Sequence, residues 1–287
     1  MTDPGLLLRA LLFVQGYQPG TVLTGIGPAW SLSVEVVFYL VLPLLAVRAW
    51  RVARTAGTSR GRIAAALAPV AVLLVIGLAG KATTGYPVPG VVSEGYRTDW
   101  HSVLERSFFC QADLFAFGMA AVVHALWERG MVPLPRHWRP AAALLAAALY
   151  LPAARVGWTG SQLSYSYTNT LVAVSCALLL ALVVLRAKPE RSFLVGVLET
   201  PPFVAIGLVS YSVFLWHEPL IYWLRDHGLT LDGVGGLGVN LAAVAFVTFA
   251  LSVLTYRFVE LPALRKKRST AQRDNAVTVE ALPTHAR

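Results

Sequence analysis

The sequence predicts an all-α fold: a polytopic membrane helical bundle of about seven transmembrane helices, with a partial helix at the N-terminus. Of the 287 residues, 56% are hydrophobic and only 14% are charged, whereas ordinary soluble domains carry about 25% charged residues. The apolar runs are long and continuous rather than alternating. Because only helices and closed barrels can span lipid, continuous runs favour helices.

The first apolar run, residues 6–14, is too short to cross a bilayer, and a loop rich in Gly and Pro follows it at 16–28. Residues 265–287 are charged and polar and are predicted to form a disordered cytoplasmic tail, which leaves 1–264 as one membrane domain. Seven spans are predicted between these ends, at residues 31–47, 63–79, 112–126, 141–153, 168–185, 204–222 and 237–258.

The distribution of Lys and Arg predicts the orientation. Seven spans place the loops 48–62, 128–139 and 186–203 and the tail on one side, where they carry 17 cations, against 5 on the other side. Cytoplasmic loops retain Lys and Arg, so the C-terminus is predicted to be cytoplasmic in a multi-pass protein of the cell membrane. These loop cations explain the net charge of +9, so it does not require a nucleic-acid partner. The two cysteines show neither metal-ligand spacing nor a disulfide framework.

A carboxylate lies a few residues inside the first predicted span. Ser31, Glu35 and Tyr39 are four residues apart, so they share one face of a helix. An ionisable group in hydrocarbon costs roughly 2.5–3.5 kcal/mol and is expected to face the bundle interior or a wet cavity. Glu35 is either a structural carboxylate that joins two helices or part of a membrane-embedded site that opens to the outer side, about 6 Å from the helix end.

A second polar group lies in the sixth predicted span. Ser210 and His217 share one helix face, and Tyr211 and Glu218 lie on the adjoining one, just before Pro219. Histidine is the usual general base near neutral pH. His217 is therefore either a base in the outer half of the membrane or a histidine satisfied by a neighbouring hydroxyl.

Two further features are weaker. Arg257 and Glu260 are three residues apart and are expected to pair as an anchor at the cytoplasmic interface, where Pro262 is expected to end the helix. The long loop predicted at 81–111 contains Arg106, which is either at the rim of an acceptor-sugar site or simply solvated. Asp113, at the start of the next span, is a weaker candidate for a buried carboxylate.

Three stretches resemble, in order, the motifs of acyltransferase family 3. WSLSVEVVFYL at 30–40 is similar to its first signature, SYSVFLWHEP at 210–219 to its Ser-Tyr-Ser-aromatic-Leu-Trp-His-x-Pro motif, and YRFVELP at 256–262 to its closing Arg-x-x-Glu-x-Pro. Residues 106–119 resemble the stretch between these motifs. The family consists of integral-membrane O-acyltransferases that modify cell-surface sugars and similar acceptors.

The resemblance implies an acyltransferase that uses an acyl-CoA such as acetyl-CoA as a donor substrate and a carbohydrate or glycolipid as acceptor, with membrane lipids around it and no bound cofactor or metal. We expect Glu35, His217 and Tyr211 to have catalytic roles, and Arg257 and Glu260, from their spacing, to have structural ones. The residues expected to bind substrate are Trp30, Ser31, Ser33, Tyr39, Ser210, Ser212 and Arg106.

Two departures from the family pattern shape these expectations. Only the first carboxylate of the family's Glu-Glu-Gln is kept, as Glu35. The family's leading Arg is followed ten residues later by an essential His, whereas Arg9 is followed at about that offset by Gly20, and the first histidine is His101. The resemblance therefore starts partway through the family's membrane domain. The alternative function is an inactive fragment, or one that depends on a partner for the missing helices.

Overall fold

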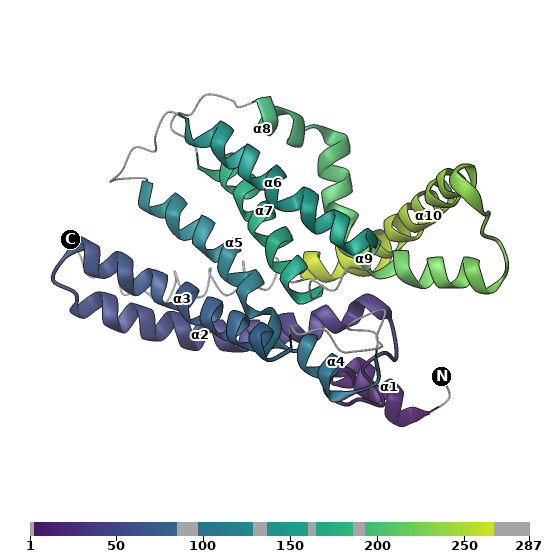
Figure 1. The fold of residues 1–287 in the computed structure, drawn as a ribbon, viewed down its shortest axis with the longest axis horizontal. Helices are drawn as coiled ribbons and strands as arrows, with labels where there is room; N and C mark the ends of the chain where they lie inside the picture. Colours follow the sequence, from purple (N-terminus) through teal and green to yellow (C-terminus); the bar gives the residue numbers. More distant parts are fainter. Residues whose placement is uncertain (1–2, 85–96, 129–136, 160–164, 186–192, 267–287) are drawn as a thin grey trace, which may run out of the picture. The chain divides into compact units, whose positions relative to one another are not determined.

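The computed structural model describes residues 3–84, 97–128, 137–159, 165–185 and 193–266, and within these ranges the regular secondary structure is helical throughout (Figure 1). Five of the described helices are long and apolar enough to cross a membrane: Gly27–Thr55, Ser59–Thr84, Tyr167–Val184, Pro201–Asp226 and Gly233–Lys266. The helical membrane fold is thus confirmed. The chain forms two compact units, residues 1–195 and 196–287, and each is described by itself.

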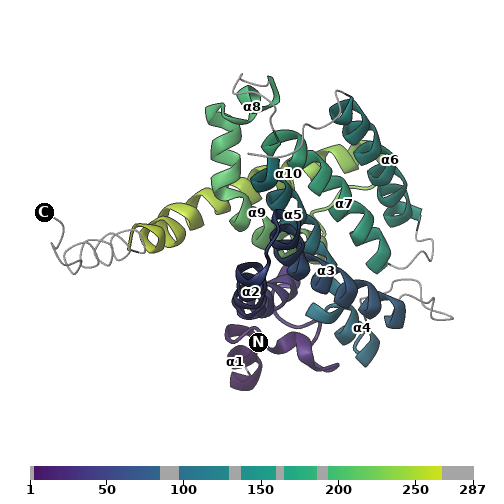
Figure 2. The same cartoon turned by 90° about the vertical axis from the view of Figure 1, so that its left-hand side faces the viewer.

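The first unit holds most of the helices. In chain order they are α1 (Pro4–Leu11), η1 (Gln15–Tyr17), η2 (Gly27–Ala29), α2 (Trp30–Thr55), α3 (Ser59–Thr84), α4 (Trp100–Glu105), α5 (Phe108–Glu128), α6 (Trp138–Thr159) and α7 (Tyr165–Val184). Helix α3 packs between α2 and α5, α5 also packs on α7, and α7 packs on α6 (Figures 1 and 2). The chain leaves this unit within α8 (Phe193–Leu198).

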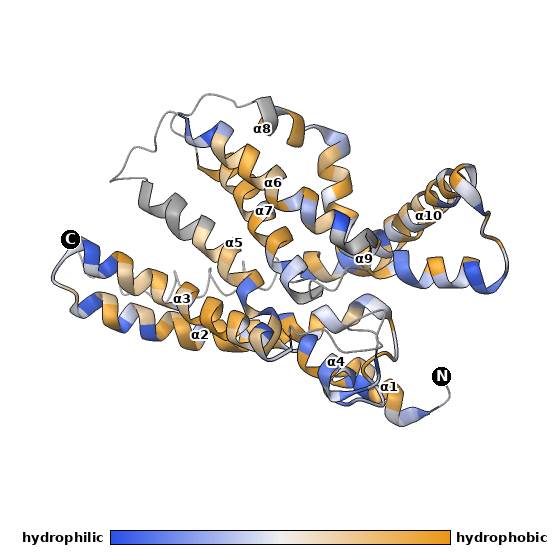
Figure 3. Ribbon diagram, viewed as in Figure 1, coloured by the Kyte–Doolittle hydropathy of each residue, from blue (hydrophilic) through white to orange (hydrophobic). Residues whose placement is uncertain are grey.

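The core of the first unit lies where α2, α3 and α5 meet. Phe38, Leu73 and Ala112 are buried there, and the rings of Phe38 and Phe115 stack with their centroids 4.1 Å apart. The apolar residues of α2 and α3 run along most of their length (Figure 3). Such continuous apolar surface suits lipid on the outside as well as protein on the inside.

Two glycines bring α3 and α5 into backbone contact. A Cβ atom on Gly77 would lie 2.3 Å from the backbone nitrogen of Asp113, and one on Gly80 would lie 2.2 Å from the carbonyl oxygen of Phe109. Any larger residue would push the helices apart. Small residues at such interfaces let membrane helices approach closely, and dispersion contacts then stabilise the pair.

The second unit is built from α9 (Pro201–Asp226), α10 (Gly233–Thr255) and the π-helix η3 (Tyr256–Glu260). Helices α9 and α10 pack against each other. The side chain of Asn240 holds the turn before α10, because its Oδ1 accepts from the backbone N–H of Leu231 at 3.0 Å and its Nδ2 donates to the Leu231 carbonyl at 2.9 Å.

All seven predicted spans are helices, but two predicted boundaries are wrong. The loop expected at 81–111 is largely helical where it is described: α3 continues to Thr84, α4 occupies Trp100–Glu105 and α5 begins at Phe108. The last helix does not end at Pro262 but continues to Lys266. The wider π turn just before Pro262 accommodates a residue that lacks the N–H needed by an α-helix. Residues 267–287 of the predicted tail lie outside the described part.

Candidate active site

Glu35 lies in the second turn of α2, beside the packed face rather than on it. The buried residues around it are Ser33, Val34 and Phe38, whereas Glu35 is half-buried and Tyr39 is 63% exposed. Glu35 makes no hydrogen bond or ion pair within the described residues. The Glu35 carboxylate is therefore available for interaction with a group other than the polar side chains of the first unit.

The four serines predicted to bind substrate all donate to acceptors within the protein. The Ser31 hydroxyl donates to the Pro28 carbonyl at 3.0 Å and the Ser33 hydroxyl to the Phe13 carbonyl at 2.7 Å. Ser33 thus binds the start of α2 to the segment that follows α1. Ser210 donates to the Gly207 carbonyl at 2.8 Å within α9, and Ser212 donates to Glu260.

Arg106 and Trp30 come together although they are far apart in the sequence. The Arg106 guanidinium carbon lies 5.7 Å from the centre of the Trp30 ring, a cation–π contact, and its Nη1 is 3.5 Å from the Val22 carbonyl oxygen. Both residues are half-buried. A guanidinium that lies over an indole ring, with both groups half-buried, offers hydrogen-bond donors beside an apolar face. This arrangement is favourable for binding a polar ring.

His217 is oriented by its own helix. Its Nδ1 lies 2.7 Å from the carbonyl oxygen of Phe214, and because a carbonyl can only accept, Nδ1 carries the proton. In the neutral ring Nε2 then has the free lone pair. This tautomer is the one a general base requires, and the ring is half-buried rather than enclosed.

Two side-chain contacts join the histidine-bearing part of α9 to the end of α10. The buried hydroxyl of Ser212 donates to a carboxylate oxygen of Glu260, and Trp216 Nε1 donates to Thr255 Oγ1 at 3.0 Å. Arg257 is exposed and forms no ion pair with Glu260 in the described part of the chain. The expected pair is thus replaced by a link between helices, because the π turn changes the spacing that an α-helix gives to residues three apart.

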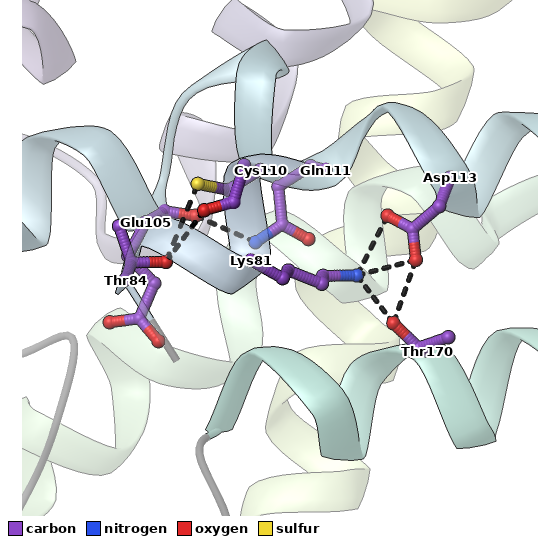
Figure 4. Close-up of polar contacts among 8 residues, drawn as sticks. Lys81, Thr84, Glu105, Cys110, Gln111, Asp113 and Thr170 are labelled. Carbon is purple, nitrogen blue, oxygen red and sulfur yellow. Dashed lines mark hydrogen bonds and ion pairs between the residues drawn. The ribbon is translucent and has the colours of Figure 1, made fainter. Parts of the chain in front are cut away.

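Asp113, predicted only as a weaker candidate for a buried carboxylate, is indeed buried, but its partner Lys81 was predicted to lie in a loop. Lys81 and Asp113 form an ion pair with neither side chain exposed; Lys81 Nζ is 2.7 Å from Oδ1 and 2.6 Å from Oδ2 of Asp113 (Figure 4). Thr170 of α7 completes a ring, since its hydroxyl accepts from Lys81 at 2.5 Å and donates to Asp113 at 2.7 Å. We call Lys81, Asp113 and Thr170 the buried charge network.

Further polar contacts extend from this network toward α4. The Thr84 and Cys110 side chains are 3.5 Å apart, and the Gln111 amide donates to the Glu105 carbonyl at 2.7 Å (Figure 4). His101 Nε2 donates to the Thr84 carbonyl at 2.8 Å. The short helix α4 is thus bound both to the end of α3 and to the start of α5.

Helix α4 begins with an aspartate cap. Asp99 Oδ1 accepts from the backbone N–H of Ser102 at 2.9 Å, and Arg97 pairs with Asp99 at 2.7 Å. Burial acts to raise the pKa of Asp99. The hydrogen bonds from Ser102 and the charges of Arg97 and His101 outweigh it, so that the pKa lies below its ordinary value.

One signal in the sequence points to the buried charge network. Asp113 is a carboxylate that enters a predicted span, and an intramembrane acid needs a partner. Lys81, however, follows directly on an apolar run, and such a lysine is ordinarily assigned to the first turn of a loop. Its pairing depends on Gly77 and Gly80, which bring α3 against α5.

The predicted chamber combines residues of both units, because Glu35 belongs to the first unit and His217 and Tyr211 belong to the second. Their common site stays a prediction. Tyr211 is 47% exposed, and Ser212 is buried against Glu260.

Comparison with known proteins shows matches along most of the chain. A family model described as an acyltransferase domain, of acyltransferase family 3, matches residues 4–257. The chain is 29% identical over 109 residues, 38% of its length, to the O-acetyltransferase OatA of Staphylococcus aureus. It is 27% identical over 239 residues, 81% of its length, to YrhL of Bacillus subtilis, a candidate peptidoglycan O-acetyltransferase. It is 25% identical over 234 residues, 79% of its length, to BcsY of Komagataeibacter xylinus, a candidate membrane-bound transacylase.

These relatives are longer proteins. The matched part of this chain covers 17% of OatA, 34% of YrhL and 51% of BcsY, so the chain spans about half or less of the curated relatives it matches. No solved structure matches.

Proposed function

Because this chain belongs to acyltransferase family 3, whose model matches residues 4–257, we propose that it is a membrane O-acyltransferase. It moves a short acyl group, such as acetyl, from acyl-CoA to a hydroxyl of a cell-envelope or extracellular carbohydrate or glycolipid. The observation that carries the proposal is the family match across both structural units, together with relatives named as O-acetyltransferases.

The donor reaches the site from the cytoplasm and the acceptor from the outer side. The excess of Lys and Arg in the loops 48–62, 128–139 and 186–203 supports a cytoplasmic C-terminus in the plasma membrane. With this orientation the N-terminal end of α2 and the histidine of α9 lie in the outer half of the bilayer. Arg106 and Trp30 then form part of the acceptor site.

The reaction needs a base and a group that holds developing negative charge. His217 Nε2 takes the proton from the acceptor hydroxyl, whose oxygen attacks the thioester carbonyl. Tyr211 donates a hydrogen bond to the tetrahedral oxyanion, and Glu35 is the motif carboxylate that we expect the reaction to need. The carbon–sulfur bond then breaks, and the CoA thiolate takes up the proton from His217. The ester forms and free CoA leaves, so protons and electrons balance.

The test uses membranes that contain the full chain, radiolabelled acetyl-CoA and glycan strands of peptidoglycan as the acceptor probe. His217→Gln is expected to lower the rate roughly 10²–10⁴-fold, as for a lost general base. His227→Gln is the matched control, because His227 Nδ1 also lies 2.8 Å from a backbone carbonyl one turn back, that of Trp223, and is exposed at the end of α9.

Equal rates for the two histidine variants would remove His217 from the mechanism. Transfer that occurs only when membranes from the native cell are added would identify a partner-dependent protein. The absence of transfer under both conditions, to these strands and to a panel of other envelope glycans, would overturn the proposed activity. Glu35→Gln is expected to lower the rate as well, and an unchanged rate would place Glu35 against lipid.

A further inference from the structure

We propose that the buried charge network of Lys81, Asp113 and Thr170 positions the turn between α4 and α5, and with it Arg106, for binding of the acceptor's hydroxyl-bearing ring. The positioning claim concerns the geometry of this chain alone. The effect on acceptor binding rests on the proposed function. Lys81, Asp113 and Thr170 are positioning residues, since Lys81 and Asp113 have no exposed side-chain surface and the Thr170 hydroxyl is bonded to both of them.

The ion pair of Lys81 and Asp113 is energetically costly to bury. Burying two charges with no exposed surface costs several kcal/mol for each ion, and a well-packed apolar pair of similar volume is often equally stable or more stable. Stability alone therefore gives little reason to place Lys81 and Asp113 here. Unlike apolar side chains, an ion pair fixes the direction of every hydrogen-bond donor and acceptor in it.

The buried charge network fixes three helices relative to one another. The three N–H donors of Lys81 have acceptors on two different helices: both Asp113 oxygens on α5 and the Thr170 hydroxyl on α7. Because Thr170 also donates to Asp113, rotation or sliding of any one of α3, α5 and α7 breaks at least one contact. The backbone contacts at Gly77 and Gly80 fix the distance between α3 and α5 at the same level.

Short hydrogen-bonded connections lead from the network to Arg106. Asp113 stands two residues after Gln111, whose amide holds the carbonyl of Glu105, the residue directly before Arg106. On the α3 side, Lys81 stands three residues before Thr84, which contacts Cys110 and accepts from His101 of α4. Both ends of α4 are thus bound within one helical turn of the network.

The position of Arg106 has a consequence for binding. The guanidinium of Arg106 lies over Trp30 at 5.7 Å and near the Val22 carbonyl at 3.5 Å, so it touches two separate segments of the chain. A shift of the turn of about 1 Å would remove these contacts. Such a shift weakens binding in the ground state and the transition state alike, which raises KM and leaves kcat nearly unchanged.

The experiment compares the double variant K81M/D113L with the wild-type chain in detergent or nanodiscs. This variant removes both charges together, so neither is left buried without a partner. Thr170→Val is the milder second variant, and it removes only the link to α7. Ser175→Ala is the matched control, because Ser175 is a buried hydroxyl of the same helix that donates to its own helix at 2.8 Å.

Two readouts decide the outcome. Hydrogen exchange is expected to become faster at residues 100–107 in both variants, with exchange at 65–76 and the control unchanged. With acetyl-CoA and peptidoglycan strands, KM for the strands is expected to rise roughly tenfold, the equivalent of one charge-assisted hydrogen bond, at nearly constant kcat. A purely structural network would give a parallel loss of folded protein and of kcat.

Unchanged exchange at 100–107 in a folded Thr170→Val or double variant overturns the inference. An unchanged KM alongside altered exchange overturns its binding part. If the wild-type chain transfers nothing to the strands, the proposed function fails, but the exchange measurement still decides whether the network positions the turn.

Discussion

The two units differ in the polar contacts that hold their helices together. In the first unit, an ion pair with no exposed surface joins α3 to α5, the Thr170 hydroxyl adds α7, and glycines bring α3 and α5 into backbone contact. In the second unit, α9 and the end of α10 are joined by Ser212 to Glu260 and by Trp216 to Thr255, where the one carboxylate is half-buried.

This contrast separates two kinds of polar contact. Deleting one partner of the buried pair leaves a charge that water cannot reach. The loss of stability then equals the desolvation penalty of that charge and not the net free energy of the ion pair. Deleting the serine in the second unit leaves a carboxylate that water can partly hydrate. Single substitutions at these polar contacts should therefore destabilise the first unit strongly and the second unit much less.

The largest expected effect comes from breaking the ion pair on one side. Asp113→Ala is expected to destabilise the protein by about 3–5 kcal/mol, because Lys81 would stay buried without its counter-ion. Thermal unfolding of the detergent-solubilised chain measures it, with Ser175→Ala as the control. A loss equal to that of the control would show that Lys81 finds another partner or reaches water.

The next effect concerns the glycines. Gly80→Ala is expected to cost about 1–3 kcal/mol, because its Cβ would lie 2.2 Å from a backbone oxygen that cannot move without α5. Gly207→Ala in α9 is the counterpart in the second unit. Apart from its chain neighbours and the nearby backbone of its own helix, no described atom lies within 4 Å of the position that its added methyl group would take, so helix propensity predicts a gain of up to about 1 kcal/mol. Equal changes in melting temperature would refute the contrast between the units.

A smaller effect is expected at the link of the second unit. Ser212→Ala is expected to cost about 1.5 kcal/mol, the value of a hydrogen bond to a charged acceptor. Ser210→Ala, which removes a hydroxyl that is exposed on the same helix, should change stability by less than about 0.5 kcal/mol. If Ser212→Ala were as costly as Asp113→Ala, the second unit would be no more tolerant than the first.

The smallest effect depends on pH. Asp99→Ala is expected to cost about 1 kcal/mol through loss of the α4 cap. The pKa of Asp99 lies below its ordinary value, so the contribution of its charge is complete above the unfolded pKa of about 3.9 and is lost as pH falls through the folded pKa. Asp99→Asn keeps the cap but removes this dependence. Melting curves of the wild type, Asp99→Ala and Asp99→Asn between neutral and acid pH test this. The melting temperatures of the wild type and Asp99→Asn should converge as the pH falls.

The fold was predictable because hydrophobicity alone determines which segments can enter a membrane. Each of the seven predicted spans is a helix, and the motif residues led to the family that the comparison confirms. The end of α3 was not predictable in this way. Lys81 resembles the first polar residue of a loop until its partner is known, and that partner lies on another helix.

The candidate site was predictable in its residues but not in their contacts. The motif serines are polar groups at helical spacing, which is compatible with substrate binding as well as with a contact inside the protein. The structure shows that all four donate to acceptors of the chain. The partner of Glu260 depends on a π turn, and this turn has no signature in the local sequence beyond the Pro that follows it.

The close pairing of Lys81 with Asp113 has a consequence for the energised membrane. Carrying a single charge through a potential of 100 mV takes about 2.3 kcal/mol. Lys81 Nζ stays within 2.7 Å of both Asp113 oxygens, so the field does opposite work on the two charges whenever the helices move together. The buried pair itself therefore adds almost nothing to any coupling between the voltage and a joint motion of α3 and α5.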